Sequence, residues 1–432
     1  MSDIIPSKRI IFVLRASPSI WASLKKAVDS TNDPTVILIQ AQAKTYAGNG
    51  ATNTSLFAQQ QWDDHPGPPP TEDEKEHVRT LLKDPDVCVD IINTSVGEHA
   101  SDRATSGQLM VQYLGDEYGV KNIRYIMPYD PDGRNDKRHI TQYQTESGKI
   151  KTREEDVIPS GMFMPRRYCR LGATAIAAFD PHSIYHIENL TQPFGKDRTA
   201  ILSNIPAITD QIITRHADTI RQGLFRIGAP DGWDKKDDPT KNMATERVKD
   251  VLRMIWEKMP EIHAQYDDVN LFIAHSQFGI TKIRKAAFKG APAKPEITGV
   301  YGNVDGCVCV LLDDLVDSGS SLIGSGERLL KEGAQYTDTA IAHGPATKEA
   351  LTIMLNSTVE VNGRATLVLN HHILTNTVTR LEDFIEKLDA RDQNRITLVN
   401  CGNEIVRELA KPFPKKLGFE LSPAYRMTIT FG

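Results

Sequence analysis

Cysteine is scarce and scattered in this sequence of 432 residues. The five cysteines are odd in number and show no metal-ligand spacing with histidine; they are Cys88, Cys169, Cys307, Cys309 and Cys401. We therefore expect neither a disulfide framework nor a cysteine–histidine metal site. This pattern is typical of a chain in a reducing compartment.

Long hydrophobic runs and an excess of positive charge are lacking as well. No apolar stretch approaches the length that a membrane span needs, and residues 1–15 do not have the layout of a signal peptide. We therefore expect a cytoplasmic chain with no membrane partner. The formal net charge is −5, so the composition predicts no general nucleic-acid surface.

What is present is a long chain with enough apolar residues to form substantial cores. Hydrophobic residues make up 40% of the sequence, and the length suits two or three domains. Apolar runs that suit strands, such as Lys8–Leu14 and Ile123–Met127, alternate with amphipathic segments such as Gly107–Tyr118. This alternation predicts α/β layers with parallel strands. The polar passage Ala43–Glu76 is expected to be a long surface loop.

One stretch, Val308 to Ser321, carries the strongest chemical signal. A short apolar run, rich in valine and leucine, predicts a buried strand that ends at Asp313 and Asp314. A small, hydroxyl-rich turn follows, and then a helix; the turn contains Asp317, Ser318, Gly319, Ser320 and Ser321. Free N–H groups at such a helix start favour a phosphate, and the two carboxylates can accept hydrogen bonds from sugar hydroxyls. The simpler alternative is a strand-to-helix turn with two capping aspartates.

This stretch resembles the ribose-phosphate motif of type I phosphoribosyltransferases and of phosphoribosyl diphosphate (PRPP) synthetases, in which Asp-Asp precedes a glycine-rich phosphate loop. The resemblance implies an α/β fold of two phosphoribosyltransferase-like domains, each a mostly parallel sheet flanked by helices. We expect an N-terminal domain over 1–200 that carries the ATP loop. A C-terminal domain over 201–432 would carry the ribose-phosphate site.

A basic segment follows the expected strand Ile123–Met127. Its two prolines and glycine predict a loop between Pro128 and His139, and its arginines and lysine suit a polyphosphate. An ordinary solvated loop is the alternative. The segment resembles the ATP-binding loop of PRPP synthetases, which implies that ATP is bound by Arg134, Asn135, Asp136, Lys137 and Arg138.

The same resemblance implies roles for three further segments. Asp180-Pro181-His182 is similar to an Asp-Leu-His sequence whose histidine lies near the ATP phosphates and magnesium, and Asp231 matches an aspartate near nucleotide and metal. We therefore expect Mg²⁺ as cofactor with His182 and Asp231 as its ligands, and His182 also among the catalytic residues. After an expected strand Asn270–Ala274, a loosely structured basic loop would supply Lys282 and Arg284 as catalytic cations, with Lys289 as a competing candidate.

The implied activity is that of a ribose-phosphate diphosphokinase, which moves the β,γ-diphosphate of ATP to the anomeric hydroxyl of ribose 5-phosphate and releases AMP. Its partners would be ATP and a ribose 5-phosphate-type acceptor, and copies of the chain would form a homo-oligomer. The family's adenine-binding segment has no clear counterpart between Val36 and Gln60. Three alternatives stay open: a larger acceptor such as ADP-ribose, a silent regulatory homologue, and a phosphoribosyltransferase that consumes PRPP.

Overall fold

The structure, a computed structural model, describes residues 5–45, 52–58, 68–94, 100–130, 140–144, 150–154, 160–230, 239–285, 294–345, 347–378 and 380–411. These residues form two compact units. Unit 1 takes the described residues of 1–15, 25–201 and 407–420, and unit 2 takes those of 16–24 and 202–406. The domains expected over 1–200 and 201–432 stay a prediction.

Unit 1 is built on a six-stranded sheet with the order β10-β9-β6-β5-β1-β2. Parallel pairing joins β1 to β2 and β5, β5 to β6, and β6 to β9. The strands are β1 (Arg9–Arg15), β2 (Val36–Gln40), β5 (Cys88–Asn93), β6 (Asn122–Met127), β9 (Ala175–Phe179) and β10 (Thr199–Leu202). The side chains of β6 and β9 are almost all buried, as in strands that helices cover on both faces.

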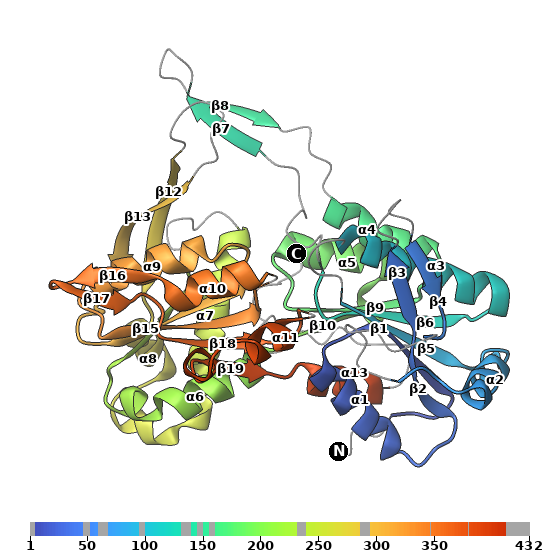
Figure 1. Cartoon of the computed structure of the whole chain (residues 1–432). Coiled ribbons are helices and arrows are strands. Elements are labelled where there is room, and N and C mark those ends of the chain that lie inside the picture. Colours follow the sequence, from blue (N-terminus) through green and yellow to red (C-terminus); the bar gives the residue numbers. More distant parts are fainter. Residues whose placement is uncertain are drawn as a thin grey trace. The chain divides into compact units, whose positions relative to one another are not determined.

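Helices and two hairpins complete unit 1 (Figure 1). The helices are α2 (Glu72–Leu81), α3 (Ala100–Tyr118), α4 (Ser160–Arg170) and α5 (Ile184–Phe194), with a 3₁₀ turn at Lys196–Arg198. The antiparallel hairpins are β3 (Gln42–Thr45) with β4 (Thr52–Ser55) and β7 (Ile140–Gln144) with β8 (Ile150–Glu154). Helix α3 packs on β5, and α4 lies beside α5 (Figure 1).

The expectation of one long loop over Ala43–Glu76 is wrong. The hairpin β3–β4 lies inside this range, and α2 begins at Glu72. Helix α2 starts there because Thr71 and Glu74 form a capping box: the Thr71 hydroxyl accepts a hydrogen bond from the Glu74 N–H at 3.3 Å, and the Glu74 carboxylate accepts one from the Thr71 N–H at 2.7 Å.

Unit 2 is built on a five-stranded parallel sheet with the order β11-β14-β15-β18-β19. Its strands are β11 (Phe225–Gly228), β14 (Val308–Leu315), β15 (Tyr336–His343), β18 (His371–Thr375) and β19 (Ile396–Val399). Its helices are α6 (Ile205–Arg221), α7 (Pro239–Lys258), α8 (Val269–Ser276), α9 (Ser320–Lys331), α10 (Lys348–Asn356), α11 (Leu381–Glu386) and α12 (Ala390–Gln393), with a 3₁₀ turn at Pro260–Ala264. Figure 1 shows α6 and α9 on opposite sides of this sheet.

Two antiparallel hairpins also belong to unit 2: β12 (Gly279–Lys285) with β13 (Lys294–Tyr301), and β16 (Thr358–Val361) with β17 (Arg364–Leu367). Each unit is thus a mostly parallel sheet flanked by helices. The α/β class predicted from the sequence is confirmed.

The strand predicted over Asn270–Ala274 is wrong, because these residues lie in helix α8. The carboxylate of Asp268 caps this helix by accepting hydrogen bonds from the N–H groups of Asn270 at 2.7 Å and Leu271 at 3.0 Å. A short apolar run bounded by polar residues fits a buried strand and a buried helix equally well, so its hydrophobic pattern could not decide.

Two short segments join a unit other than that of their sequence neighbours. The beginning of α1 (Pro18–Asp29) belongs to unit 2, where the buried Asn376 amide donates to Ser17 Oγ at 3.0 Å and to Ser19 Oγ at 2.6 Å. The end of α13 (Gly402–Ala410) belongs to unit 1, where Arg124 Nη1 lies 2.6 Å from Glu408 Oε1. The chain therefore completes each unit with a piece from far along the sequence.

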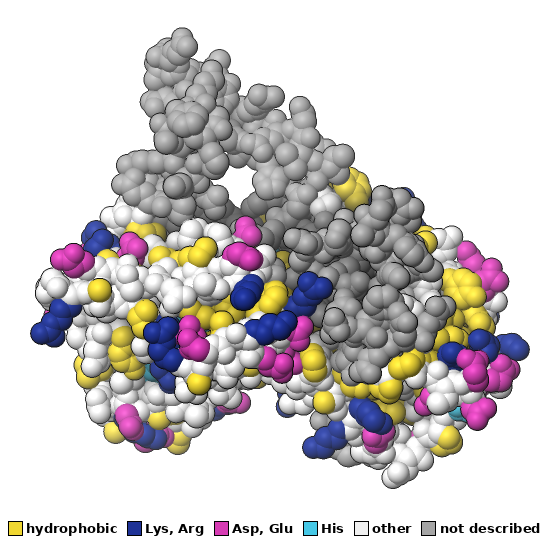
Figure 2. Space-filling view, viewed as in Figure 1, with side chains coloured by type: hydrophobic (Ala, Val, Ile, Leu, Met, Phe, Trp, Pro, Cys, Tyr) yellow, Lys and Arg dark blue, Asp and Glu magenta, His cyan; other side chains and the backbone are white. Residues whose placement is uncertain are grey.

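On the face shown in Figure 2, lysine and arginine side chains are interspersed with aspartate and glutamate over the described residues. None of the described helices combines the length and apolar character that crossing a membrane requires.

Candidate functional site

The two adjacent aspartates lie where the sequence predicted them, at the carboxyl end of β14. This strand runs between β11 and β15, and its residues from Val308 to Leu312 are buried. Asp313 and Asp314 are half-buried, and the Asp313 carboxylate accepts a hydrogen bond of 2.9 Å from the Asp314 N–H. Parallel sheets bind ligands at the carboxyl ends of their strands, so the two carboxylates lie where a polar ligand can bind.

The turn after β14 has the geometry of an anion site. Gly319 has φ of 77°, a left-handed conformation that favours glycine, and a β-carbon there would lie 2.9 Å from Met354 Cγ. The turn leads directly into α9, whose N-cap Gly319 makes no side-chain capping bond, and the first N–H groups of a helix have no acceptor within the helix itself. Ser318 and Ser320 are exposed, and their hydroxyls lie 3.1 Å apart.

The neighbouring strands bring further polar groups to the same edge of the sheet in unit 2. Leu315 is paired with His343, the last residue of β15. The His343 Nδ1 atom lies 2.9 Å from the hydroxyl of Thr377, which follows β18. Parallel strands end at one edge, so the predicted Asp-Asp and turn residues share this edge with the histidine and threonine.

Sequence reasoning missed one residue at this edge, Arg247 of α7. Its side chain is 4% exposed, and its Nη1 atom lies 3.8 Å from Asp314 Oδ2. Helix α7 packs against both β11 and β14, which carries Arg247 to the strand end. The apolar stripe of α7 accounts for the packing of this helix. A role for Arg247 is indicated only by its burial, which the structure shows and the sequence does not.

A second group of predicted residues lies in unit 1, at the carboxyl end of β9. Asp180 is buried with φ of 38°, and His182 is half-buried. Residues other than glycine with a positive φ cluster at functional sites, so the conformation of Asp180 favours a functional role for this turn. Ser183 caps α5 by accepting a hydrogen bond of 3.1 Å from the His186 N–H.

A buried pair beside this turn was not predicted from the sequence. His186 Nε2 lies 2.8 Å from Asp130 Oδ2, and both side chains are almost fully buried. Asp130 follows β6, which is paired with β9, so the pair links the segments after two neighbouring strands. This contact anchors Asp130, the last described residue before the segment that was predicted to bind ATP.

The remaining predicted residues are only partly described. Arg134, Asn135, Asp136, Lys137 and Arg138, as well as Asp231 and Lys289, lie outside the described residues. Lys282 and Arg284 lie on β12, where the backbone pairs Lys282 with Ile297 and Arg284 with Pro295. The expectation that both residues lie in a loosely structured loop is therefore wrong, since antiparallel pairing with β13 orders this backbone.

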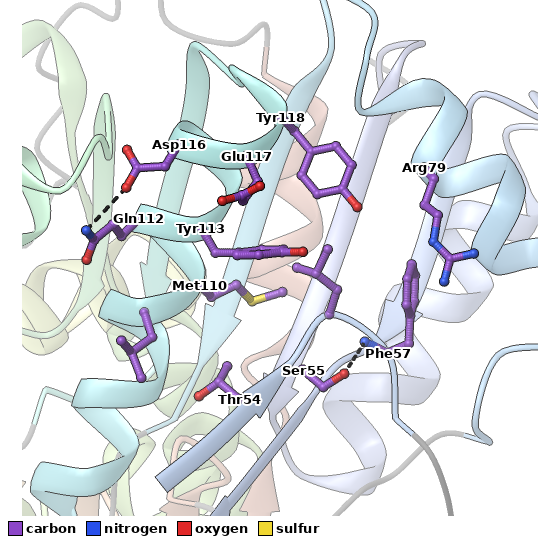
Figure 3. Close-up of a pocket in the computed structure, with 12 residues that line it drawn as sticks. Thr54, Ser55, Phe57, Arg79, Met110, Gln112, Tyr113, Asp116, Glu117 and Tyr118 are labelled. Carbon is purple, nitrogen blue, oxygen red and sulfur yellow. Dashed lines mark hydrogen bonds between the residues drawn. The ribbon is translucent and has the colours of Figure 1, made fainter.

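Unit 1 also contains a pocket of about 600 Å³ (Figure 3). Arg79 lies over the ring of Phe57, with 5.3 Å between the guanidinium carbon and the ring centroid, and Tyr113 meets Tyr118 edge to face. Residues of β4, α2 and α3 line most of the pocket, and none of them was predicted as a site residue; they are Thr54, Ser55, Leu56, Phe57, Arg79, Leu109, Met110, Gln112, Tyr113, Asp116, Glu117 and Tyr118.

Comparisons with known proteins agree with the resemblance in sequence. No protein-family model matches the chain. The ribose-phosphate pyrophosphokinase of Agrobacterium fabrum is 43% identical over 53 residues, which cover 12% of this chain and 17% of that protein. The enzyme of the same name from Maricaulis maris is 27% identical over 156 residues, which cover 33% of this chain and 44% of that protein. Over these segments the chain is similar to the ribose-phosphate pyrophosphokinases.

A solved structure is similar in fold over nearly the whole chain. The phosphoribosylpyrophosphate synthetase from Mycobacterium smegmatis matches with a TM-score of 0.58 and 16% sequence identity, covering 93% of this chain and 97% of that one. The fold is therefore that of a PRPP synthetase, as predicted. In sequence, the chain spans less than half the length of the two curated relatives described above.

Proposed function

We propose that the protein is a ribose-phosphate diphosphokinase, which transfers the β,γ-diphosphate of ATP to the anomeric hydroxyl of ribose 5-phosphate and releases AMP. One observation carries this proposal: paired carboxylates at the end of β14 are followed at once by a left-handed glycine and a helix N-terminus. This arrangement offers hydrogen-bond acceptors for a sugar diol beside donors for its phosphate.

The residues of unit 2 would bind the acceptor. Asp313 and Asp314 accept hydrogen bonds from the ring hydroxyls, and the 5-phosphate lies at the start of α9. The hydroxyls of Ser318, Ser320 and Ser321 add donors around the phosphate, with Asp317 at the edge of the loop. This arrangement holds the anomeric oxygen in one place, and orientation of this kind accounts for a large share of catalysis in phosphoryl transfer.

The ATP side is proposed from the resemblance and from the geometry in unit 1. Arg134, Lys137 and Arg138 would bind the phosphates of ATP, with Asn135 and Asp136 completing the loop. The positive φ of Asp180 and the buried contact between Asp130 and His186 support a functional role for the carboxyl ends of β6 and β9. Lys282 and Arg284 would act as catalytic cations on the diphosphate in flight, and His182 would donate a hydrogen bond to it.

Magnesium fits this site mainly through the substrate. The described residues contain no group of three or more histidine, cysteine, aspartate or glutamate side chains that could hold a metal ion. Mg²⁺ commonly binds one or two carboxylates together with substrate phosphates and water, so a dedicated protein cage is not needed. From the resemblance we propose Asp231 and His182 as its ligands, and the bound ion would neutralise charge on the phosphates.

We also propose that copies of the chain associate in the cytoplasm as a homo-oligomer. Two large side chains of α3 support this, because Leu109 is 44% exposed and Tyr113 is 47% exposed. Exposed apolar side chains that lie together favour an interaction surface. Light scattering of the purified chain tests this part separately from the activity.

The activity is tested by incubating the full chain with Mg-ATP and ribose 5-phosphate. We expect AMP and a sugar that carries a new diphosphate group, both detectable by chromatography and phosphorus NMR. Incubation without ribose 5-phosphate is the control for hydrolysis of ATP. Failure to form AMP with the acceptor present, in a protein that is folded by circular dichroism, would contradict the proposal.

A further inference from the structure

A buried arginine next to the paired aspartates is not accounted for by packing alone. Arg247 lies in α7 with only 4% of its side chain exposed, and Asp314, with 11% exposed, is 3.8 Å away. Removing a guanidinium from water is costly, so an arginine at this depth requires negative charge close by. The carboxylate at the strand end supplies that charge.

The other buried charge of α7 has a different partner. Asp250 lies one helical turn after Arg247, but its carboxylate contacts Arg253, with 2.7 Å between Arg253 Nη1 and Asp250 Oδ1. Burial raises the pKa of Asp250 to about 7, and the charges that act on it are those of Arg253, Glu246 and Lys249. The described part of α7 thus shows Arg247 beside Asp314 and Arg253 beside Asp250, two separate arginine–carboxylate contacts.

Two adjacent carboxylates repel each other when both are ionised, and a nearby cation offsets this repulsion. A guanidinium also holds a carboxylate in a defined orientation, because its N–H groups form a rigid planar fork. At 3.8 Å the contact between Arg247 Nη1 and Asp314 Oδ2 is an ion pair rather than a hydrogen bond, and its attraction favours rotamers of Asp314 that face α7. An oriented carboxylate loses less entropy when it accepts a hydroxyl hydrogen bond.

We propose that Arg247 is a positioning residue for the acceptor, which acts through Asp314 and does not itself touch the sugar. This inference rests on the proposed function of the Asp313–Asp314 pair. Arg247 offsets the charge of the Asp314 carboxylate and favours the rotamer that faces the ring hydroxyls of a ribose 5-phosphate unit. Loss of Arg247 weakens binding of the sugar phosphate and leaves ATP binding unchanged.

The test is a double-mutant cycle on the full chain, with Arg247→Gln, Asp314→Asn and the combined variant. Calorimetry measures the affinity for ribose 5-phosphate and, separately, for Mg-ATP. We expect each single variant to weaken sugar-phosphate binding about tenfold, as for loss of one charge-assisted interaction. The combined variant should lose little more than either single one, because both act through the same carboxylate.

Arg253→Gln is the matched control, since it removes the other arginine–carboxylate pair of the same helix without touching Asp314. It should leave both affinities unchanged. Arg247→Lys keeps the charge without the planar fork and covers the case in which Arg247→Gln does not fold; it should also bind ribose 5-phosphate more weakly than the native chain.

The outcomes separate this inference from the proposed function. If Asp314→Asn leaves sugar-phosphate binding unchanged, the assignment of the acceptor site itself fails. If Asp314→Asn weakens binding but the effect of Arg247→Gln is absent or simply additive, the acceptor site stands and the positioning role is wrong. A loss of affinity in Arg247→Lys that extends equally to Mg-ATP would also overturn the positioning role.

Discussion

The buried charges that join α13 to the sheet of unit 1 give a strong prediction for stability. Arg124 Nε lies 2.6 Å from Asp90 Oδ1, and Arg124 Nη1 lies 2.6 Å from Glu408 Oε1, with all three side chains fully buried. Arg9 completes the group, with its Nε atom 3.4 Å from Asp90 Oδ2 and its Nη1 atom donating to the Leu409 carbonyl. Two positive and two negative charges thus balance in the interior.

Glu408→Gln removes one negative charge and leaves the buried Arg124 and Arg9 with one carboxylate, that of Asp90, between them. Breaking a buried ion pair from one side typically costs about 3–5 kcal/mol. Because Arg124 still has Asp90 and also donates to the Glu408 carbonyl at 3.0 Å, we expect a loss near the lower end, about 3 kcal/mol. Urea unfolding, followed by circular dichroism, measures the change in the transition of unit 1.

The control is Lys411→Ala, because Lys411 is the exposed partner of the same carboxylate, 3.0 Å from Glu408 Oε2. Surface changes of this kind usually lie within about 0.5 kcal/mol. The reasoning is refuted if Glu408→Gln unfolds at the same urea concentration as the native chain, or if Lys411→Ala is equally destabilising. In either case the α13 contact would not hold unit 1 together.

Three further predictions concern other parts of the molecule. Lys282→Ala or Arg284→Ala should lower kcat with nearly unchanged affinity for ATP, since cations that act only in the transition state contribute little to ground-state binding; steady-state kinetics beside calorimetry decides this. Burial lowers the pKa of His372 to about 3, so as the pH falls the unfolded chain takes up a proton before the folded chain does. The free energy of unfolding should therefore decrease as the pH drops from about 6.5 towards 3, by up to about 1.4 kcal/mol per pH unit. In urea unfolding at several pH values, His372→Gln should flatten this slope. A β-carbon at Gly107 would collide with the hydroxyl of Tyr125, so Gly107→Ala should destabilise unit 1 by about 1–3 kcal/mol. Adding Tyr125→Phe should restore part of this loss. Equal stability of the single and the double variant would contradict the collision.

The sequence allowed the central strand and the glycine turn after it to be predicted because the signal there is local. The apolar run of β14, the two aspartates and the glycine turn lie within one short stretch, so composition and spacing suffice. Gly319 adopts the left-handed conformation that such a turn requires. The parallel sheets followed from the alternation of strands and helices, which is also a local pattern.

The parts that could not be predicted depend on contacts between distant residues. Nothing near Glu408 indicates that it meets Arg124, and nothing near Ser17 indicates that it meets Asn376. Arg247 could not be linked to Asp314 for the same reason. The strand wrongly expected at Asn270–Ala274 shows a different limit, since a short buried run has no periodicity that distinguishes helix from strand.

The position of the transferred group tests the central claim most directly. The native chain and the Asp313→Asn/Asp314→Asn variant are each incubated with Mg-ATP and ribose 5-phosphate, and phosphorus NMR follows the products. The account predicts AMP and a diphosphate on the anomeric carbon with the native chain, and a rate lower by tenfold or more with the folded variant, since each charge-assisted hydrogen bond contributes about 1.5–3 kcal/mol. Formation of ADP in place of AMP, or equal rates in the two proteins, would contradict it.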